Sequence, residues 1–309
     1  MAKQDINNVP SIETIIAWGL GAYAAISLFL FVFLTNNITI WRERSSNIPF
    51  GLTKGRQEKK HLEKPRRIYW VCRNPSHKGW TVMLHSWGRK SERMVTRAQP
   101  HWDRGYSLLF VDARSHGESE YTRITTGYHY AKDVIEIMKK ERIERPILHG
   151  LSFGAIAATI IAREYPVKAL ILEATSATIR AIYWDFYHYL RIPKIFFGWI
   201  PWLLLKIDWP WDELAPKNSL KKQNIPIFLI HGEKDELFDP EKHAEAIWEK
   251  IKDKPHVFKW IVPNSPHSRM AKHPEYYTRV ERFLEYVEKI EGEKTHFTLQ
   301  STDKTDTAS

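Results

Sequence analysis

A serine set between glycines offers the first chemistry in this chain of 309 residues. Ser152 is the centre of Gly150-Leu151-Ser152-Phe153-Gly154, a G-x-S-x-G pattern between a short apolar run and a long stretch rich in Ala and Ile. Small residues here allow a strand to turn sharply into a helix, because larger side chains would collide with the crowded backbone. Such a turn presents the hydroxyl at the end of a sheet. The pattern by itself also fits a serine in an ordinary strand-to-helix turn.

A nucleophilic serine needs an imidazole to take its proton and a carboxylate to orient that imidazole. Asp235 closes the segment His231-Gly232-Glu233-Lys234-Asp235, directly after the apolar run 225–230, and His267 follows the apolar run 257–262. Both runs are typical of buried strands, so both side chains are predicted to lie where strands end. The order serine, aspartate, histidine, each just past a strand, is expected of one particular fold.

Each assignment has an alternative in the sequence. Glu173 ends the predicted strand 169–172 and Asp239 lies one turn past Asp235, so either could supply the carboxylate. His273 is a nearby alternative to His267, but we expect it just inside the last helix. We therefore favour Asp235 and His267, which fall in the loops after strands.

The remaining histidines do not form a recognisable metal site. His129 has Asp133 four residues further on, which gives two candidate ligands, fewer than a structural or catalytic metal usually has. His149 has no such partner near it in the sequence. We expect satisfied core or surface histidines, and predict neither a metal nor a cofactor.

Two further segments carry a family resemblance. His85-Ser86-Trp87-Gly88 follows a predicted strand at 80–84 and is similar to an H-G-x-G oxyanion loop. Residues 112–119, Asp-Ala-Arg-Ser-His-Gly-Glu-Ser, follow a predicted strand at 107–111 and are similar to a D-x-R-x-H-G-x-S segment. With these motifs the chain from residue 66 to 291 resembles serine hydrolases of the α/β-hydrolase superfamily, of the esterase, lipase and monoacylglycerol-lipase type.

The resemblance implies a role for each matching residue. Ser152 would be the nucleophile, His267 the general base and then acid, and Asp235 the orienting carboxylate. The backbone N–H groups of Phe153 and Trp87 would hold the oxyanion. Ser86 stands where the family usually has glycine, which leaves open whether residue 86 or 87 donates. His116, within the second motif, would have a packing role.

A second feature lies near the start of the chain. Residues 15–34 contain no charge and are rich in Leu, Ile, Phe and Ala, long enough to cross about 30 Å of hydrocarbon. We predict a transmembrane helix at 15–35 after a tail at 1–14. A cleaved signal peptide normally has a shorter apolar core, a more basic front and a small-x-small cleavage site, whereas residues 35–39 read Thr-Asn-Asn-Ile-Thr. A buried core helix is a further alternative, although nothing polar marks a solvent face.

The charges indicate how such a helix would be oriented. The net charge is +10, from 46 basic and 36 acidic residues, and the densest basic part, 54–67, lies beyond the apolar helix. By the positive-inside rule the domain that follows faces the cytoplasm, and the single Cys72 agrees with a reducing compartment. We expect contact with anionic lipid heads or simply a solvated linker, and no nucleic-acid binding, since no such module is visible.

The rest of the chain predicts a single α/β domain at 65–291. Strands alternate with helical stretches at 91–102, 131–142, 155–164, 241–252 and 275–290, which is typical of a mostly parallel central sheet with helices on both faces. We assign 36–64 to a basic juxtamembrane linker or edge segment. Residues 292–309, rich in Thr, Ser and Lys, are predicted to be a disordered polar tail.

An aromatic-rich helical cap is predicted at about 176–222. It contains the apolar run 195–205, which is too short to span a bilayer and is interrupted by Pro201. These residues either pack the cap onto the sheet or line a lipophilic acyl pocket near the membrane.

Two classes of function remain. The first is a membrane-anchored serine hydrolase that cleaves a carboxylic ester or thioester of a lipophilic acyl substrate, with amide or peptide hydrolysis by the same residues as an alternative. The second is a non-catalytic scaffold or binding protein on a hydrolase fold. Epoxide and haloalkane hydrolysis are disfavoured, because family members with those activities carry aspartate at the position of Ser152.

Overall fold

The computed structural model describes residues 10–40, 57–122, 125–189, 191 and 211–303. The chain divides into two compact units, one formed by Met1–Trp41 with Tyr183–Trp209 and the other by Arg42–Ile182 with Pro210–Ser309. The second unit contains every strand of the sheet described below. The predicted apolar run 195–205 lies outside the described residues.

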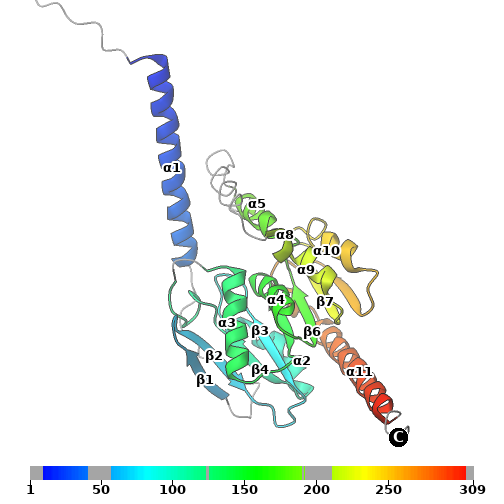
Figure 1. Cartoon of the computed structure of the whole chain (residues 1–309). Helices are drawn as coiled ribbons and strands as arrows, with labels where there is room; N and C mark the ends of the chain where they lie inside the picture. Colours follow the sequence, from blue (N-terminus) through cyan, green and yellow to red (C-terminus); the bar gives the residue numbers. More distant parts are fainter. Residues whose placement is uncertain (1–9, 41–56, 123–124, 190, 192–210, 304–309) are drawn as a thin grey trace, which may run out of the picture. The chain divides into compact units, whose positions relative to one another are not determined.

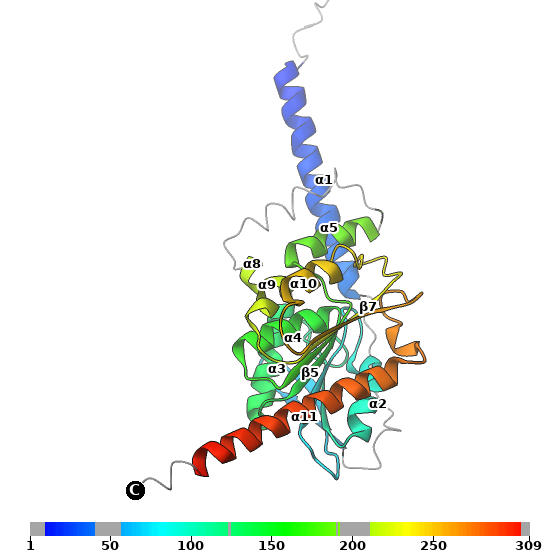
Figure 2. The ribbon, with the colours of Figure 1, turned by 90° about the vertical axis from the view of Figure 1, so that its right-hand side faces the viewer.

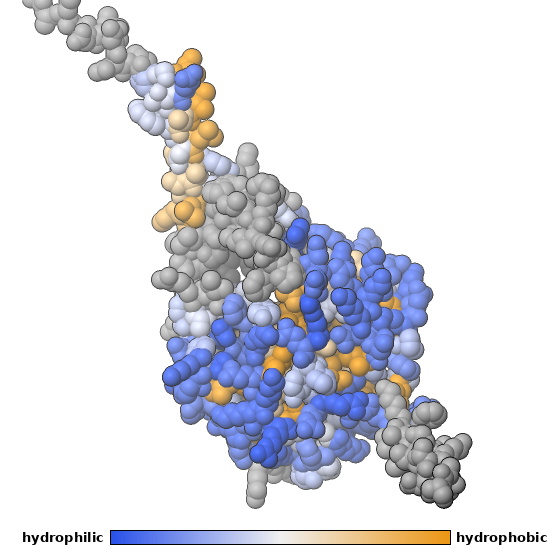
Figure 3. Space-filling view, in the orientation of Figure 1, coloured by the Kyte–Doolittle hydropathy of each residue, from blue (hydrophilic) through white to orange (hydrophobic). Residues whose placement is uncertain are grey.

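Helix α1 (Ile12–Ile40) belongs to the first unit and contains the predicted transmembrane segment. Exposed apolar side chains between residues 12 and 29 include Ile15, Trp18 and Phe29. Figure 3 shows hydrophobic residues on the surface of this helix. The window Ile12–Phe29 is long and apolar enough to cross a membrane, a test that a signal sequence also passes. Only 6% of that window is buried, which disfavours a core helix of a soluble protein.

The second unit is built on one sheet of eight strands, in the order β1-β2-β4-β3-β5-β6-β7-β8. Strand β2 pairs antiparallel with β1 and β4, and all other pairs are parallel. The strands are β1 (Gln57–Leu62), β2 (Arg67–Cys72), β3 (Trp80–Leu84), β4 (Ser107–Val111), β5 (Ile147–Leu151), β6 (Ala169–Glu173), β7 (Ile227–Gly232) and β8 (Val257–Val262). Strands β2 to β7 are buried along their whole length, as continuous apolar runs in a parallel sheet require.

Helices cover both faces of this sheet (Figures 1 and 2). Successive side chains of a strand point to opposite faces of the sheet, so each strand contributes side chains to the hydrophobic core on either face. Val82 and Leu148 pack with α3 (Gly127–Lys140), α4 (Phe153–Glu164) and α10 (Ala244–Ile251) on one face. Met83 and Ile147 pack on the other with α2 (Val95–Asp103) and α11 (Tyr276–Asp303). The predicted α/β architecture is therefore present.

Several boundaries differ from the sequence-based prediction. Strands β1 and β2 were not predicted as strands, and β1 occupies part of the segment 36–64, which was assigned to a linker or edge segment. Helix α11 continues to Asp303, through the described part of the predicted disordered tail. A helix that has already formed extends at little cost, because each added residue contributes one hydrogen bond. Within the predicted cap, the described residues form α5 (Ile179–Tyr189), α8 (Trp211–Leu214), α9 (Pro216–Ser219) and a short 3₁₀ turn, Leu220–Lys222.

Candidate active site

The serine of the G-x-S-x-G pattern stands at the junction of β5 and α4. Ser152 has φ +52° and ψ −110°, a conformation that L-residues rarely adopt. A Cβ atom on Gly154 would lie 2.1 Å from the Leu84 carbonyl oxygen, and one on Gly150 would lie 2.4 Å from the Gly154 carbonyl oxygen. Only glycine fits at both positions, and this close packing holds the strained serine backbone at the end of the sheet.

The three residues predicted to act together form one chain of hydrogen bonds. His267 Nε2 lies 3.0 Å from Ser152 Oγ, and His267 Nδ1 lies 2.7 Å from Asp235 Oδ2 and 2.9 Å from Oδ1. Because an ionised carboxylate can only accept, Nδ1 carries the proton and Nε2 is free to accept from the serine hydroxyl. This is the arrangement that turns a serine into a nucleophile.

The carboxylate is held by more groups than the histidine alone. The backbone N–H groups of Leu237 and Phe238 donate to Asp235 Oδ1, and His231 Nε2 lies 3.2 Å from Asp235 Oδ2. Burial raises the pKa of Asp235, but the hydrogen bonds from His231 and His267 lower it by more than burial raises it. The pKa of Asp235 therefore lies well below the usual range. Asp235 is therefore ionised at neutral pH and stabilises a positive charge on His267.

Packing fixes the ring of His267 as well. The Phe238 ring stands edge-to-face against it, with centroids 5.1 Å apart. Phe238 also accepts a hydrogen bond at its carbonyl oxygen, at 2.6 Å from His231 Nε2. His231 thus bridges the carboxylate and the residue that packs on the imidazole.

The predicted oxyanion loop follows β3 and is ordered by a buried histidine. His85 Nε2 accepts from the Ala113 backbone N–H at 3.0 Å, so its Nδ1 carries the proton and donates to the Ser86 carbonyl oxygen at 2.8 Å. The Trp87 ring packs edge-to-face on the Phe153 ring with centroids 4.9 Å apart. The two residues whose N–H groups are predicted to bind an oxyanion therefore lie side by side.

His116 packs against both of these aromatic rings. Its ring centroid lies 4.9 Å from that of Trp87 and 5.8 Å from that of Phe153, and the residue is only 2% exposed. Its Nδ1 donates to the Arg114 carbonyl oxygen at 3.0 Å. This buried position agrees with the expected packing role.

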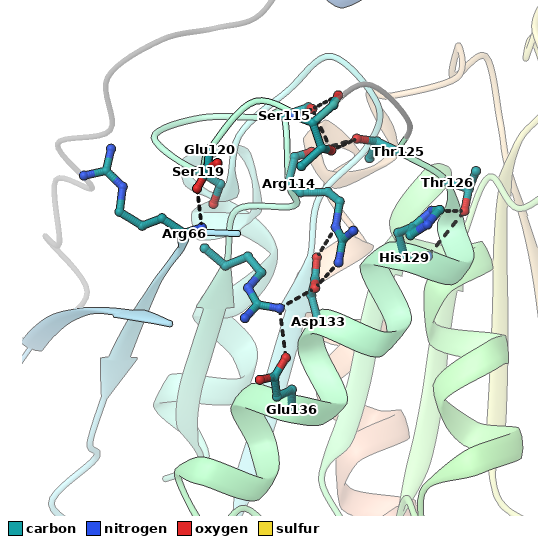
Figure 4. Close-up of polar contacts among 12 residues, drawn as sticks. Arg66, Arg114, Ser115, Ser119, Glu120, Thr125, Thr126, His129, Asp133 and Glu136 are labelled. Carbon is teal, nitrogen blue, oxygen red and sulfur yellow. Dashed lines mark hydrogen bonds and ion pairs between the residues drawn. The ribbon is translucent and has the colours of Figure 1, made fainter. Parts of the chain in front are cut away.

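An ion-pair cluster fastens the loop that carries His116 (Figure 4). Arg114 donates through Nε and Nη2 to the two oxygens of Asp133 on α3, at 2.8 and 2.5 Å. Arg67 on β2 donates to the same carboxylate at 2.7 Å and to Glu136 at 2.8 Å. Since Asp133 is buried, this shared, bidentate pairing fixes the loop against strand and helix.

The alternatives considered for the acid and the base lie elsewhere. Asp239 is exposed and accepts from the Glu241 backbone N–H, and His273 precedes α11 and contacts the Trp260 ring. Glu173 is fully buried and binds Arg97 and His149. None of these four contacts involves Ser152 Oγ or the His267 imidazole.

The histidines considered as metal ligands are also accounted for. His129 Nδ1 lies 2.8 Å from Thr126 Oγ1, while its suspected partner Asp133 binds two arginines (Figure 4). His149 is a buried histidine paired with Glu173. In the described ranges, no group of three or more His, Cys, Asp or Glu side chains is placed to hold a metal ion.

Two residues that bind the candidate acids were not predicted. His231 stands four positions before Asp235, and its place at the end of an apolar run was the available signal. Arg97 lies in a helical stretch far from any motif, where a single arginine reads as a surface residue. Nothing in the local sequence marks it as buried.

The comparisons with known proteins concern the family and the fold. A family model described as the alpha/beta hydrolase family matches residues 81–280. No curated protein matches the sequence.

Solved structures with the same fold include several hydrolases. The Pyrococcus furiosus esterase Pf2001 has 20% sequence identity and a TM-score of 0.63, covering 79% of this chain and 98% of that chain. A membrane phospholipase A, described as a bacterial virulence factor, has 17% identity and a TM-score of 0.59, covering 90% and 99%. The mouse alpha/beta hydrolase domain-containing protein 10 has 19% identity and a TM-score of 0.56, covering 75% and 99%. At these identities the similarity concerns the fold.

Proposed function

We propose that this chain, which belongs to the alpha/beta hydrolase family, is a membrane-anchored serine hydrolase that cleaves carboxylic esters or thioesters of lipophilic acyl substrates. The observation that carries the proposal is the continuous hydrogen-bond chain from Ser152 Oγ through His267 to Asp235. Esterases among the structures of similar fold support the reaction class.

The mechanism follows from the protonation states. Ser152 Oγ attacks the acyl carbon while its proton moves to His267 Nε2, and Asp235 stabilises the imidazolium that forms. The carbonyl oxygen becomes an oxyanion, which the backbone N–H groups of Phe153 and Trp87 bind. The C–O or C–S bond then breaks, and the leaving group takes the proton from Nε2.

A second half-reaction regenerates the serine. Water enters, gives a proton to His267 Nε2 and attacks the acyl carbon of the acyl-enzyme. The bond to Ser152 Oγ breaks, the oxygen recovers its proton from Nε2, and a carboxylic acid leaves. Each residue of the hydrogen-bond chain therefore acts twice.

The choice of lipophilic substrate rests on the segments around the domain. Helix α1 exposes apolar side chains between Ile12 and Phe29, and the basic segment 54–67 follows it in the sequence. An uncleaved helix with a basic cytoplasmic flank would hold the domain at a bilayer whose anionic lipids attract that flank. The aromatic cap sequence, with its run at 195–205, is suited to acyl chains.

The experiment is labelling of the detergent-solubilised protein with a fluorophosphonate, followed by peptide mass spectrometry. An adduct on Ser152 that disappears in Ser152→Ala supports an activated serine, and a series of p-nitrophenyl esters and thioesters then gives the preferred acyl length. The matched control is Ser176→Ala, a change at another buried serine, which should label normally.

Two results would contradict the proposal. Folded wild-type protein that never reacts favours a scaffold, since a phosphonate needs only the nucleophile and its base. Labelling of Ser152 combined with turnover of amides but not esters favours a peptidase or amidase.

A further inference from the structure

A second polar network lies in the core beside the site, centred on Glu173. This residue ends β6 and is fully buried. Arg97 Nε on α2 lies 2.9 Å from Glu173 Oε2, and His149 Nε2 on β5 lies 2.8 Å from Oε1. The hydroxyl of Tyr276, on α11, also donates to Oε1. Four separate elements therefore meet at one carboxylate.

Proton positions along this network follow from the acceptor at its centre. His149 must donate from Nε2 to Glu173, so its Nδ1 accepts from His101 Nε2 at 3.0 Å, and His101 Nδ1 accepts from the Thr81 hydroxyl at 2.9 Å. Burial lowers the pKa of both histidines, so both are neutral donors. Within the described part of the chain, Arg97 is then the one positive charge in contact with Glu173.

The network contacts the backbone of Ser152 and the backbone of the residue that follows His267. The Ser152 backbone N–H donates to the Glu173 carbonyl oxygen at 2.8 Å. Arg97 Nη2 lies 3.2 Å from the carbonyl oxygen of Ser268, the residue next to His267. Glu173 thus holds the serine turn through its main-chain carbonyl group. Its side chain binds Arg97, which in turn holds the loop that carries His267.

We propose that Arg97 is a positioning residue that, through its pair with Glu173, sets the His267 loop at the correct distance from Ser152. The inference rests on the proposed function for its catalytic meaning. A buried ion pair contributes little net stability compared with a well-packed apolar pair, because desolvation offsets the attraction. A guanidinium is planar and carries N–H donors in fixed directions, so it can donate to a carboxylate and to a carbonyl group at the same time. This geometry is a reason for an arginine at position 97.

Two variants separate positioning from stability. Arg97→Lys keeps the charge but replaces the fork with a single nitrogen atom. The double variant Arg97→Met/Glu173→Gln removes both charges together, so that no buried ion is left without a partner. The matched control is Arg104→Gln, which removes a pair with Glu288 that links the residue after α2 to α11 but lies outside the network.

The measurements are kcat and KM with a short-chain ester, the rate of fluorophosphonate labelling, and Tm. We expect both Arg97 variants to lose about 10- to 100-fold in kcat and in labelling rate, with KM within about twofold, because a displacement near 1 Å at a reacting group has an effect of that size. The double variant should keep a Tm within about 5 °C of the wild type, and Arg104→Gln should keep kcat. Wild-type kcat in both Arg97 variants would overturn the inference.

A spectroscopic readout keeps this test separate from the test of the function. The proton of His267 Nδ1 bound to Asp235 should give a low-field NMR resonance that does not depend on turnover. If the wild type fails to react with the phosphonate, the proposed function fails, yet loss of this resonance in Arg97→Lys and its retention in Arg104→Gln would still support positioning by Arg97. A resonance unchanged in Arg97→Lys would overturn it.

Discussion

His267 Nε2 lies 3.0 Å from Ser152 Oγ, although the two residues are 115 positions apart in the chain. The contact joins a strained serine turn after β5 to a loop after β8, so it exists only because the parallel strands present their carboxyl ends at one edge of the sheet. From this contact we expect the two side chains to act as one unit in the reaction.

Ser152→Ala and His267→Ala are expected to have nearly the same effect alone and combined. Each should lower kcat by about 10⁴-fold or more, and the double variant should lose little beyond either single variant, because the residues act as one unit. Steady-state kinetics with a chromogenic ester would measure this, with circular dichroism as the control for folding. Losses that multiply in the double variant would mean that the two side chains act independently.

A second prediction concerns His231 as a donor to Asp235. His231→Phe removes the hydrogen bonds to Asp235 Oδ2 and to the Phe238 carbonyl oxygen. We expect kcat to fall about tenfold, since the carboxylate then loses a charge-assisted bond and the ring that packs on His267 loses its anchor. His256→Phe is the control, since that histidine pairs with Tyr286 away from the site. Equal kcat in both variants would assign His231 no part in orienting the acid.

The residues brought together by the fold could be predicted because each follows a buried strand. Ser152, Asp235 and His267 each come after an apolar run, and β8 begins and ends as predicted. The turn glycines and the order of the three residues supplied further local signals. Hence the edge of the sheet at which the site lies could be inferred from the apolar runs and the residues that follow them.

What could not be predicted depends on contacts between distant segments. Strand β1 reads Gln-Glu-Lys-Lys-His-Leu and is an exposed edge strand, so it lacks the apolar run that identifies a buried one. Arg97 is buried only because Glu173, 76 positions away, supplies the opposite charge. The sequence near either residue gives no sign of this pair.

A third prediction is the pH dependence of stability that comes from Glu173. Burial raises its pKa, but the charge of Arg97 and the hydrogen bonds of His149 and Tyr276 lower it to about 2. A carboxyl group whose pKa is lower in the folded than in the unfolded state adds stability above its unfolded pKa, about 4.3, and this contribution is lost as the pH falls toward 2.

Glu173→Gln should therefore weaken the dependence of the unfolding free energy on pH between about 4.5 and 2. Urea denaturation at a series of pH values would measure it. Glu249→Gln, at an exposed pair with Lys252, is the control and should leave the curve unchanged. An identical slope for Glu173→Gln and the wild type would show that the pKa of Glu173 is not depressed.

A fourth prediction tests the close packing of the serine turn. Gly154→Ala places a methyl group 2.1 Å from the Leu84 carbonyl oxygen, so either the turn or β3 must move. We expect a loss of at least ~2 kcal/mol in the free energy of unfolding, together with most of the activity. Gly292→Ala, an exposed position on α11 with nothing within 4 Å of the new methyl group, should instead be neutral or stabilising by up to about 1 kcal/mol.

The last prediction concerns α1 as an anchor. Its apolar side chains would be unfavourable in water, whereas a bilayer of about 30 Å of hydrocarbon would accept the window Ile12–Phe29. The full chain should stay with membranes after alkaline carbonate extraction and should keep its first residues by N-terminal sequencing. A variant lacking residues 1–40 should move to the supernatant and still label at Ser152. If the protein expressed from the full sequence is instead released and has lost its N-terminal residues, the apolar helix is a cleaved signal sequence, because the anchor is then absent from the mature protein.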